Sequence, residues 1–167
     1  DPHAEDLDIN DIAHALSNQC RYTGHVKQHY SVAAHSVVVS DLLCPYGLGL
    51  AGLLHDAAEA YLSDIARPMK VLPFMDDMRM YQDKIERVVF HKYGVSLSES
   101  ERKLVKEADT AALNAEGRQL MNGWNTEFDV NPDMYGEAWH NTWLMRKLSI
   151  EQVKLVFLNR MEFVYAS

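Results

Sequence analysis

The length, composition and charge of the chain narrow the classes of protein to consider. With 167 residues, of which 47% are hydrophobic, the chain can form one core and is too short for two ordinary domains. Its net charge of −8 argues against a protein that mainly grips a nucleic-acid backbone. No apolar run reaches the roughly 20 residues of a membrane span. Two cysteines and no signal-peptide pattern favour the cytoplasm.

Helical spacing of apolar residues runs through almost the whole chain, and no segment has the alternation of a convincing strand. The predicted helices span residues 10–16, 31–43, 48–61, 75–93, 99–121, 137–145 and 149–165. The helix over 48–61 is apolar nearly all round, which predicts a central, buried position. Residues 63–73 are expected to form turns, and 122–148 to be mainly loop outside its one helix. The chain is thus predicted to be an all-α bundle of about five to seven helices.

Two capping boxes mark the beginnings of the last long helices. Ser98 with Glu101, and Ser149 with Gln152, have the spacing at which each side chain bonds the backbone amide of the other residue. The helices are therefore expected to begin directly after these two serines.

Ionisable residues stand inside segments that are otherwise suited to burial. His55 and Asp56 lie between apolar pairs, although this dipeptide alone would occur by chance about as often as not. His35 is surrounded by valine and alanine, and Asp109 has alanines nearby. Buried polar groups need partners, and a buried charge needs a counter-charge or a metal. One shared metal ion would satisfy all four residues, and a self-contained hydrogen-bond cluster is the alternative.

The order of these residues, H…HD…D along consecutive helices, resembles the HD-domain phosphohydrolase superfamily. The residues around them also match its small single-domain members, so the resemblance covers nearly the whole chain. The matching segments are Tyr30-Ser31-Val32-Ala33-Ala34-His35-Ser36, His55-Asp56-Ala57-Ala58-Glu59-Ala60-Tyr61, Asp64-Ile65 and Arg67-Pro68-Met69-Lys70. The members concerned are bacterial 5′-deoxynucleotidases and compact, often phage-encoded, deoxynucleoside triphosphate triphosphohydrolases. The resemblance implies a single HD domain over residues 1–167.

The expected cofactor follows from the ligand types. Two imidazoles and two carboxylates suit one divalent transition ion, Mn, Co, Fe, Ni or Zn, better than Mg²⁺. Further divalent ions could accompany the substrate. Glu59 shares the helical face of His55 and Asp56 and is the expected base for the attacking water. The resemblance implies that Asp64 protonates the leaving 5′ oxygen, and a turn or cap residue is the alternative interpretation.

Cations are expected around the metal to hold phosphate. Arg21 and Tyr22 resemble the Arg–aromatic substrate pair of the 5′-nucleotidases, in which the arginine binds phosphate and the aromatic ring flanks the base. Lys70 and Lys106 are further expected phosphate contacts, with solvated surface positions as the alternative. The matching turn also places Pro68 among the substrate-binding residues.

Other chemically notable residues have plainer interpretations. His25 and His29 are four residues apart, as in a metal pair, but a phosphate contact or a surface position is favoured. Trp124, Trp139 and Trp143 could cover the site, although core packing or a subunit interface is favoured.

The implied function is hydrolysis of the 5′ phosphoester of a deoxynucleotide. Lys70 and Lys106 favour a dATP-type triphosphohydrolase that releases triphosphate, and a deoxynucleoside 5′-monophosphatase is the alternative. A cyclic-nucleotide or alarmone hydrolase would share the metal and differ in the pocket. A non-catalytic nucleotide sensor is expected to lack the water-activating carboxylate, yet Glu59 is present. Because the resembling families form dimers or larger rings, a homo-oligomer is expected.

Overall fold

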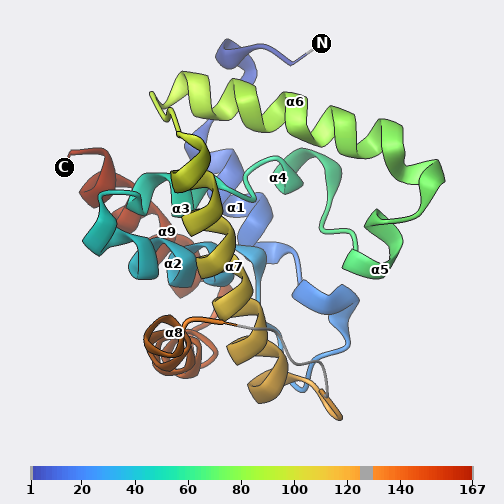
Figure 1. Cartoon of the computed structure of the whole chain (residues 1–167), viewed down its shortest axis with the longest axis vertical. Coiled ribbons are helices and arrows are strands. Elements are labelled where there is room, and N and C mark those ends of the chain that lie inside the picture. Colours follow the sequence, from blue (N-terminus) through green and yellow to red (C-terminus); the bar gives the residue numbers. More distant parts are fainter. Residues whose placement is uncertain (1, 125–129, 167) are drawn as a thin grey trace.

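Helices account for every named element in residues 2–124 and 130–166, which the computed structural model describes (Figure 1). The long helices are α1 (Ile9–Asn18), α2 (Val32–Leu43), α6 (Asp76–Lys92), α7 (Glu99–Leu120), α8 (Pro132–Met145) and α9 (Ile150–Tyr165). The short α-helices are α3 (Gly49–Leu54), α4 (Glu59–Leu62) and α5 (Arg67–Lys70). Single 3-10 turns are η1 (Ala4–Asp6), η2 (Arg21–Gly24), η3 (Cys44–Tyr46) and η4 (Pro73–Met75). The predicted all-α bundle is confirmed.

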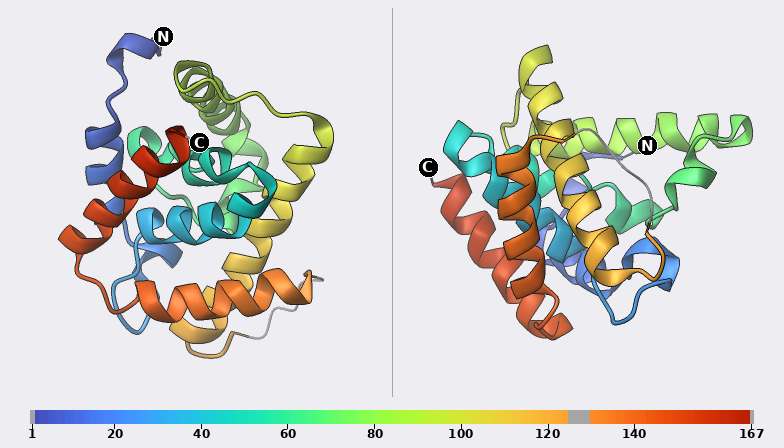
Figure 2. Two further views of the ribbon diagram at one scale, coloured as in Figure 1. Left: turned by 90° about the vertical axis from the view of Figure 1, so that its left-hand side faces the viewer. Right: turned by 60° about the horizontal axis from the view of Figure 1, so that its bottom comes forward.

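Helix α2 lies in the middle of the bundle. Helices α1, α3, α7, α8 and α9 pack around it (Figures 1 and 2). Every residue of α2 except Asp41 is buried, and most are alanine, serine or valine, whose short side chains allow close approach. Helix α3, the first part of the helix predicted over 48–61, is buried as expected and packs directly on α2, but the central position belongs to α2. His35 is carried by this central helix.

The third predicted helix is divided in the structure. Helix α3 ends at Leu54, a turn follows, and α4 begins at Glu59. Within the turn, backbone hydrogen bonds join residues three apart, as from the amide of Glu59 to the carbonyl of Asp56. His55 Nδ1 donates to the carbonyl of Gly52, which the amide of Asp56 would use in a continuous α-helix. The prediction of one helix is wrong here because a polar side chain competes for the backbone.

The start of α8 also differs from the prediction. The helix begins at Pro132, five residues before the expected start at 137. The Asn131 side chain caps it by accepting from the amides of Asp133 and Met134. An asparagine followed by proline is a helix-start signal that the apolar spacing did not reveal.

Both predicted capping boxes, before α7 and before α9, are present.

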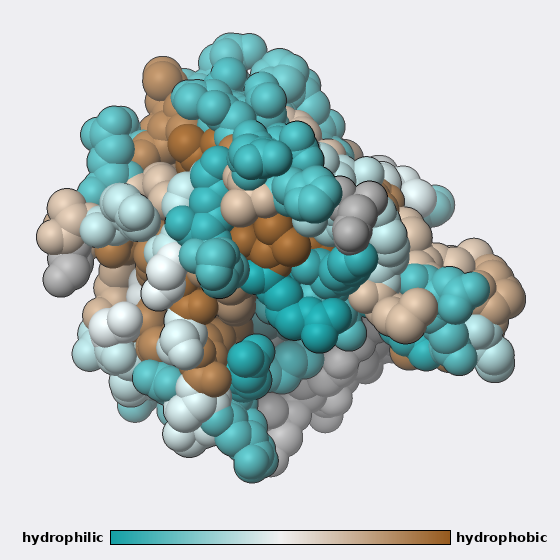
Figure 3. Space-filling view, turned by 90° about the horizontal axis from the view of Figure 1, so that it is seen from above, coloured by the Kyte–Doolittle hydropathy of each residue, from teal (hydrophilic) through white to brown (hydrophobic). Residues whose placement is uncertain are grey.

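Helix α6 lies across one end of the bundle, at the top of Figure 1. It buries Ile85, Val89 and Phe90, and its Gln82 and Glu86 side chains line the cavity described below. Viewed from above, this end of the molecule is mostly hydrophilic, with smaller hydrophobic areas between (Figure 3). Throughout the described ranges, every helix is too short or too polar to cross a lipid bilayer.

Gly52 allows α3 to approach α2 closely. A Cβ atom at this position would lie 2.8 Å from Leu43 Cδ1 and 2.9 Å from the carbonyl oxygen of Val39. The second of these atoms belongs to the backbone of α2 and cannot turn away. A larger residue would therefore push α3, and the His55 that follows it, away from His35.

We expect Gly52→Ala to lower the free energy of unfolding by about 1–3 kcal/mol, because it overpacks the contact between the two helices. The matched control is Gly136→Ala in the interior of α8, where a Cβ would meet no described atom within 4 Å. Alanine there should raise the free energy of unfolding by about 0.5–1 kcal/mol. Urea denaturation measures both values. Equal stability of wild type and Gly52→Ala would contradict the close approach.

Candidate metal centre and adjoining pocket

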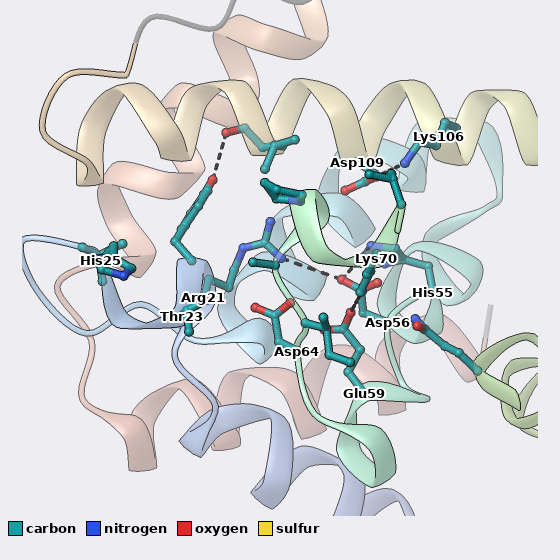
Figure 4. Close-up of a pocket in the computed structure, with 18 of the residues that line it drawn as sticks. Arg21, Thr23, His25, His55, Asp56, Glu59, Asp64, Lys70, Lys106 and Asp109 are labelled. Carbon is teal, nitrogen blue, oxygen red and sulfur yellow. Dashed lines mark hydrogen bonds and ion pairs between the residues drawn. The ribbon is translucent and has the colours of Figure 1, made fainter. Parts of the chain in front are cut away.

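The four predicted metal ligands converge from three helical segments. His35 comes from α2. His55 and Asp56 come from the turn after α3, and Asp109 comes from α7 (Figure 4). His35 Nε2 lies 3.3 Å from Asp109 Oδ1 and 3.7 Å from Asp56 Oδ2. His55 Nε2 lies 3.3 Å from the same Asp56 oxygen. Ligand atoms of His35, His55 and Asp109 all lie within 4.8 Å of one another, so one ion could contact them together.

The hydrogen bonding of the two imidazole Nε2 atoms indicates whether the cluster suits a metal ion. Both are buried and, within the described part of the chain, have no hydrogen-bond partner. The Nδ1 atoms are both used, since His35 Nδ1 lies 2.8 Å from Glu116 Oε1 and His55 Nδ1 donates to Gly52. A proton on Nδ1 leaves a lone pair on Nε2. Two unpaired ring nitrogens that face two carboxylates fit a metal better than a self-contained hydrogen-bond cluster.

The charges of the cluster also suit a cation. Burial opposes ionisation of Asp56 and Asp109, but neighbouring histidines outweigh it and lower both pKa values. Burial and Arg21 act to lower the pKa of His35, whereas Glu116 and Asp109 overcome them and raise it to about 9. A proton and a metal ion would compete for the same lone pair on His35. The cluster therefore concentrates negative charge around nitrogen atoms that need a positive partner.

Glu116 is a site residue that sequence reasoning missed. It lies on α7, seven residues after Asp109, and is 0% exposed. Its Oε2 atom lies 2.9 Å from Arg21 Nε, while Oε1 faces His35. Although burial opposes it, Arg21 lowers the pKa of Glu116. The available signal was the spacing of two helical turns from Asp109, which puts both carboxylates on one face of α7.

The loop that carries Arg21 is held by long-range contacts. An isolated antiparallel bridge joins Cys20 to Ser31, and the Arg21 amide donates to the carbonyl of Tyr30. Tyr22 and Thr23 both have left-handed backbone conformations, with φ of 56° and 53°. Such strain is retained where the surroundings fix it. The result is that Arg21 points toward the metal cluster, with Nη1 3.8 Å from Asp56 Oδ2 (Figure 4).

The Tyr22 side chain forms part of the pocket wall. Its hydroxyl donates to the carbonyl of Leu113 on α7 at 3.0 Å. Its ring meets the ring of Trp124 edge-on, with 5.9 Å between centroids. Trp124 lines the pocket, and its ring also packs closely against Gly117 of α7. It therefore combines the two interpretations that the sequence left open, a cover of the site and a packing residue. Trp139 and Trp143 are exposed.

Glu59 lies next to the metal cluster and is 2% exposed. Lys70 Nζ lies 2.6 Å from its Oε1 atom, while Oε2 has no hydrogen-bond partner in the described residues. Burial and the Asp56 carboxylate raise the pKa of Glu59 to about 7, although Lys70 acts in the opposite direction. A carboxylate with this pKa can both accept and release a proton near neutral pH.

Asp64 reaches the pocket through a constrained turn. Ser63, directly before it, has φ 71° and ψ 154°, a conformation that is rare outside glycine. Gln19 holds the turn from the opposite side: its Nε2 donates to the carbonyl of Glu59, and its Oε1 accepts from the Asp64 amide. Gln19 was not predicted. Figure 4 shows Asp64 between Arg21 and Glu59.

A cavity of about 1450 Å³ opens beside the metal cluster. The predicted substrate residues Arg21, Tyr22, Pro68, Lys70 and Lys106 all line it. Its volume exceeds that of a typical small-molecule pocket. The predicted contacts therefore share one space with the metal ligands that face it.

Positive side chains at this cavity are largely paired with acids. Lys106 Nζ lies 2.6 Å from Asp109 Oδ2, and its side chain is 60% exposed. Arg102, one turn before Lys106 on α7, also lines the cavity and was missed, although its spacing from Lys106 is a sequence signal. His25 lines the end of the cavity away from the metal cluster (Figure 4). His29 Nε2 lies 3.2 Å from the Ser17 carbonyl instead.

Metal ions are expected to stabilise the fold, because the ligands come from three separate segments. Mn²⁺ or Co²⁺ at roughly 100 times its Kd should add about 2.7 kcal/mol to the free energy of unfolding. Thermal unfolding with and without a chelator measures this gain. His55→Gln should lose most of it, and the exposed control His140→Gln should keep it. An unchanged Tm of the wild type with all five expected ions would contradict the metal centre.

Comparison with known proteins gives two relatives. No family model matches the chain. The chain is 43% identical over 116 residues to the uncharacterized protein YfdR of Escherichia coli K12, a match that covers 70% of this chain and 62% of YfdR. The chain thus spans less than two thirds of that relative's length. The uncharacterized protein RCAP_rcc00048 of Rhodobacter capsulatus is 32% identical over 139 residues, covering 77% of this chain and 70% of the relative. The chain therefore belongs to the same family as RCAP_rcc00048.

Proposed function

We propose that this protein is an HD-type, metal-dependent phosphohydrolase that cleaves the 5′ phosphoester of a deoxynucleotide. One observation carries the proposal. Within the described part of the chain, the Nε2 atoms of His35 and His55 have no hydrogen-bond partner, and they face two carboxylates at the edge of a large cavity. A buried carboxylate and a buried arginine adjoin the same cluster. A metal site that served only stability would not need these two additional groups.

The chain supplies the metal ligands and a base. His35, His55, Asp56 and Asp109 would hold the ion, which when bound lowers the pKa of a coordinated water and polarises a phosphoryl group. Glu59 would take the proton from the attacking water. Its proximity to the cluster, its burial and its pKa of about 7 support this role. Lys70 would fix the orientation of the Glu59 carboxylate through Oε1.

Arg21 and Asp64 would act on the phosphate and the leaving group. Because Glu116 holds Nε of Arg21, the two terminal amino groups of the guanidinium remain for a bidentate phosphate contact. Asp64 would donate a proton to the departing 5′ oxygen. Its place between Arg21 and Glu59 puts it beside the groups that would bind the phosphate and activate the water (Figure 4).

The cations at the cavity favour a triphosphate substrate of the dATP type. Lys70, Lys106 and Arg102 all line the cavity, and its volume leaves space for a base, a sugar and a triphosphate chain. A triphosphate would compete with Glu59 and Asp109 for the two lysines. The same pairing favours the second candidate, a 5′-monophosphatase, because a monophosphate does not require either lysine to leave its carboxylate.

Products identify the substrate. With Mn²⁺ or Co²⁺, we expect dATP to yield deoxyadenosine and inorganic triphosphate. The measurement separates phosphate, pyrophosphate and triphosphate after incubation with dNTPs, dNMPs and cyclic nucleotides. Phosphate from dAMP without triphosphate from dATP would select the monophosphatase. No product from a protein that retains its metal would overturn the enzyme and favour a nucleotide sensor.

The roles of two neighbouring acids can be separated. Asp56→Asn should lose both metal and turnover, because it removes a ligand charge. Glu59→Gln should keep metal and lower kcat by at least about 100-fold, because it removes the base. The control Glu162→Gln, exposed on α9, should preserve both properties. Metal analysis and steady-state kinetics are the measurements. Equal metal loss in the Asp56 and Glu59 variants would make Glu59 a ligand instead of the base.

A further inference from the structure

The buried carboxylate of Glu116 contacts two functional groups at once. Oε1 lies 2.8 Å from Nδ1 of the metal ligand His35, and Oε2 lies 2.9 Å from Nε of Arg21. Glu116 and His35 are 0% exposed, and Arg21 is 8% exposed. Water therefore has little access to replace either contact. Oε1 thus contacts His35, whereas Oε2 contacts Arg21 and also accepts from the Tyr22 hydroxyl at 3.4 Å.

The contact with His35 determines which ring nitrogen faces the metal cluster. An ionised carboxylate can only accept hydrogen bonds, so His35 Nδ1 must carry a proton. Nε2 is then the nitrogen that faces Asp109 and Asp56, and its lone pair can bind a metal ion once the ion has displaced the Nε2 proton. A carboxylate behind a ligating histidine also increases the basicity of the ring and fixes its orientation.

The contact with Arg21 determines where its guanidinium points. Nε is the guanidinium nitrogen nearest the backbone, so its ion pair with Glu116 Oε2 at 2.9 Å leaves the two terminal nitrogens to extend beyond Glu116. Nη1 accordingly lies 3.8 Å from Asp56 Oδ2, at the edge of the cavity. Because Glu116 and Asp109 stand two turns apart on the same rigid helix, α7 fixes both contacts relative to the metal ligands.

We propose that Glu116 is a positioning residue that couples metal binding to phosphate binding. The same carboxylate holds the His35 tautomer that binds metal and the Arg21 orientation that binds phosphate. The phosphate part rests on the proposed function, and the metal part does not. The coupling requires two acceptor oxygens. An amide at position 116 has one oxygen and one NH₂ group, so either His35 Nδ1–H or Arg21 Nε–H would face a donor.

The first test is the isosteric variant Glu116→Gln, with Mn²⁺ alone as the probe. Its Mn²⁺ affinity, measured by calorimetry, should fall by about 10–100-fold. The control Glu107→Gln makes the same chemical change at an exposed position of α7 and should bind Mn²⁺ as the wild type does. An unchanged affinity in Glu116→Gln would overturn the proposal.

The second test separates coupling from a merely structural role. The side-chain nitrogen of glutamine is as many bonds from Cα as Nε of arginine, and glutamine also offers an oxygen. In an Arg21→Gln background, the amide at 116 can turn its oxygen to His35 and its NH₂ group to the amide oxygen introduced at position 21. Glu116→Gln should therefore cost at most a few-fold in Mn²⁺ affinity there. The same fold-loss in both backgrounds would overturn the coupling.

Folding of each variant is checked by circular dichroism and thermal unfolding. If Glu116→Gln alone does not fold because Arg21 lacks a partner, the double variant remains the test, since it buries no charge at either position. Wild-type-like Mn²⁺ affinity of the double variant supports the proposal, and a loss of about 10-fold or more overturns it.

Inorganic triphosphate is the probe for the phosphate part. At saturating Mn²⁺, Glu116→Gln should bind triphosphate more weakly than Glu107→Gln does. Bound Mn²⁺ favours the orientation in which the amide oxygen accepts from His35, and the NH₂ group then turns Arg21 aside. Equal triphosphate affinity would overturn this part. Neither probe requires turnover. Absence of nucleotide hydrolysis with the expected metal results would therefore overturn the proposed function and leave the role of Glu116 in metal binding intact.

Discussion

A histidine in the centre of a helical bundle needs a partner for each of its two ring nitrogens. His35 lies on α2, the most enclosed helix, and is 0% exposed. Burial without such partners would cost several kcal/mol, on the order of a large part of the stability of a domain. Glu116 satisfies one nitrogen, and the other faces Asp109 and Asp56. This requirement explains why α7 has two carboxylates on the face that packs against α2.

The second carboxylate creates a further requirement. Glu116 is fully buried and ionised, so it needs a positive charge as well as the His35 proton. Arg21 supplies this charge from a loop whose backbone is bound at Cys20, Ser31 and Tyr30. The conformation of the loop is thus tied to the core of the bundle. A group that could bind substrate is placed at the cavity by an interaction that also stabilises the interior.

The sequence predicts which residues belong to the candidate site better than it predicts the contacts between them. His35, His55, Asp56 and Asp109 are detectable because each interrupts an apolar stretch in a recognisable order. Glu116 gives no comparable local signal, because the polar residues Asn114 and Arg118 stand close to it in the sequence. Only its distance from Asp109 along the helix distinguishes it from an ordinary glutamate of a helix surface.

The fold shows the same limit. The long helices follow from apolar spacing and capping boxes, which are local signals. The turn after Leu54 depends on His55 bonding to the Gly52 carbonyl, and the path of Arg21 depends on a contact with Tyr30. Both contacts form only when the site is assembled, so short-range sequence patterns do not predict them. The start of α8, by contrast, was available from Asn131 and Pro132.

Helix α7 carries a candidate metal ligand, a buried carboxylate and two cations that line the cavity on one rigid rod. Along such a rod each added or deleted residue turns everything beyond it by about 100° and shifts it by about 1.5 Å. A single-residue insertion between Asp109 and Glu116 would carry Glu116 out of reach of His35 and Arg21. Ala111, Ala112, Asn114 and Ala115, which lie between the two carboxylates, are buried. The site therefore restricts the length of this segment, and the packing of α7 in the core restricts its composition.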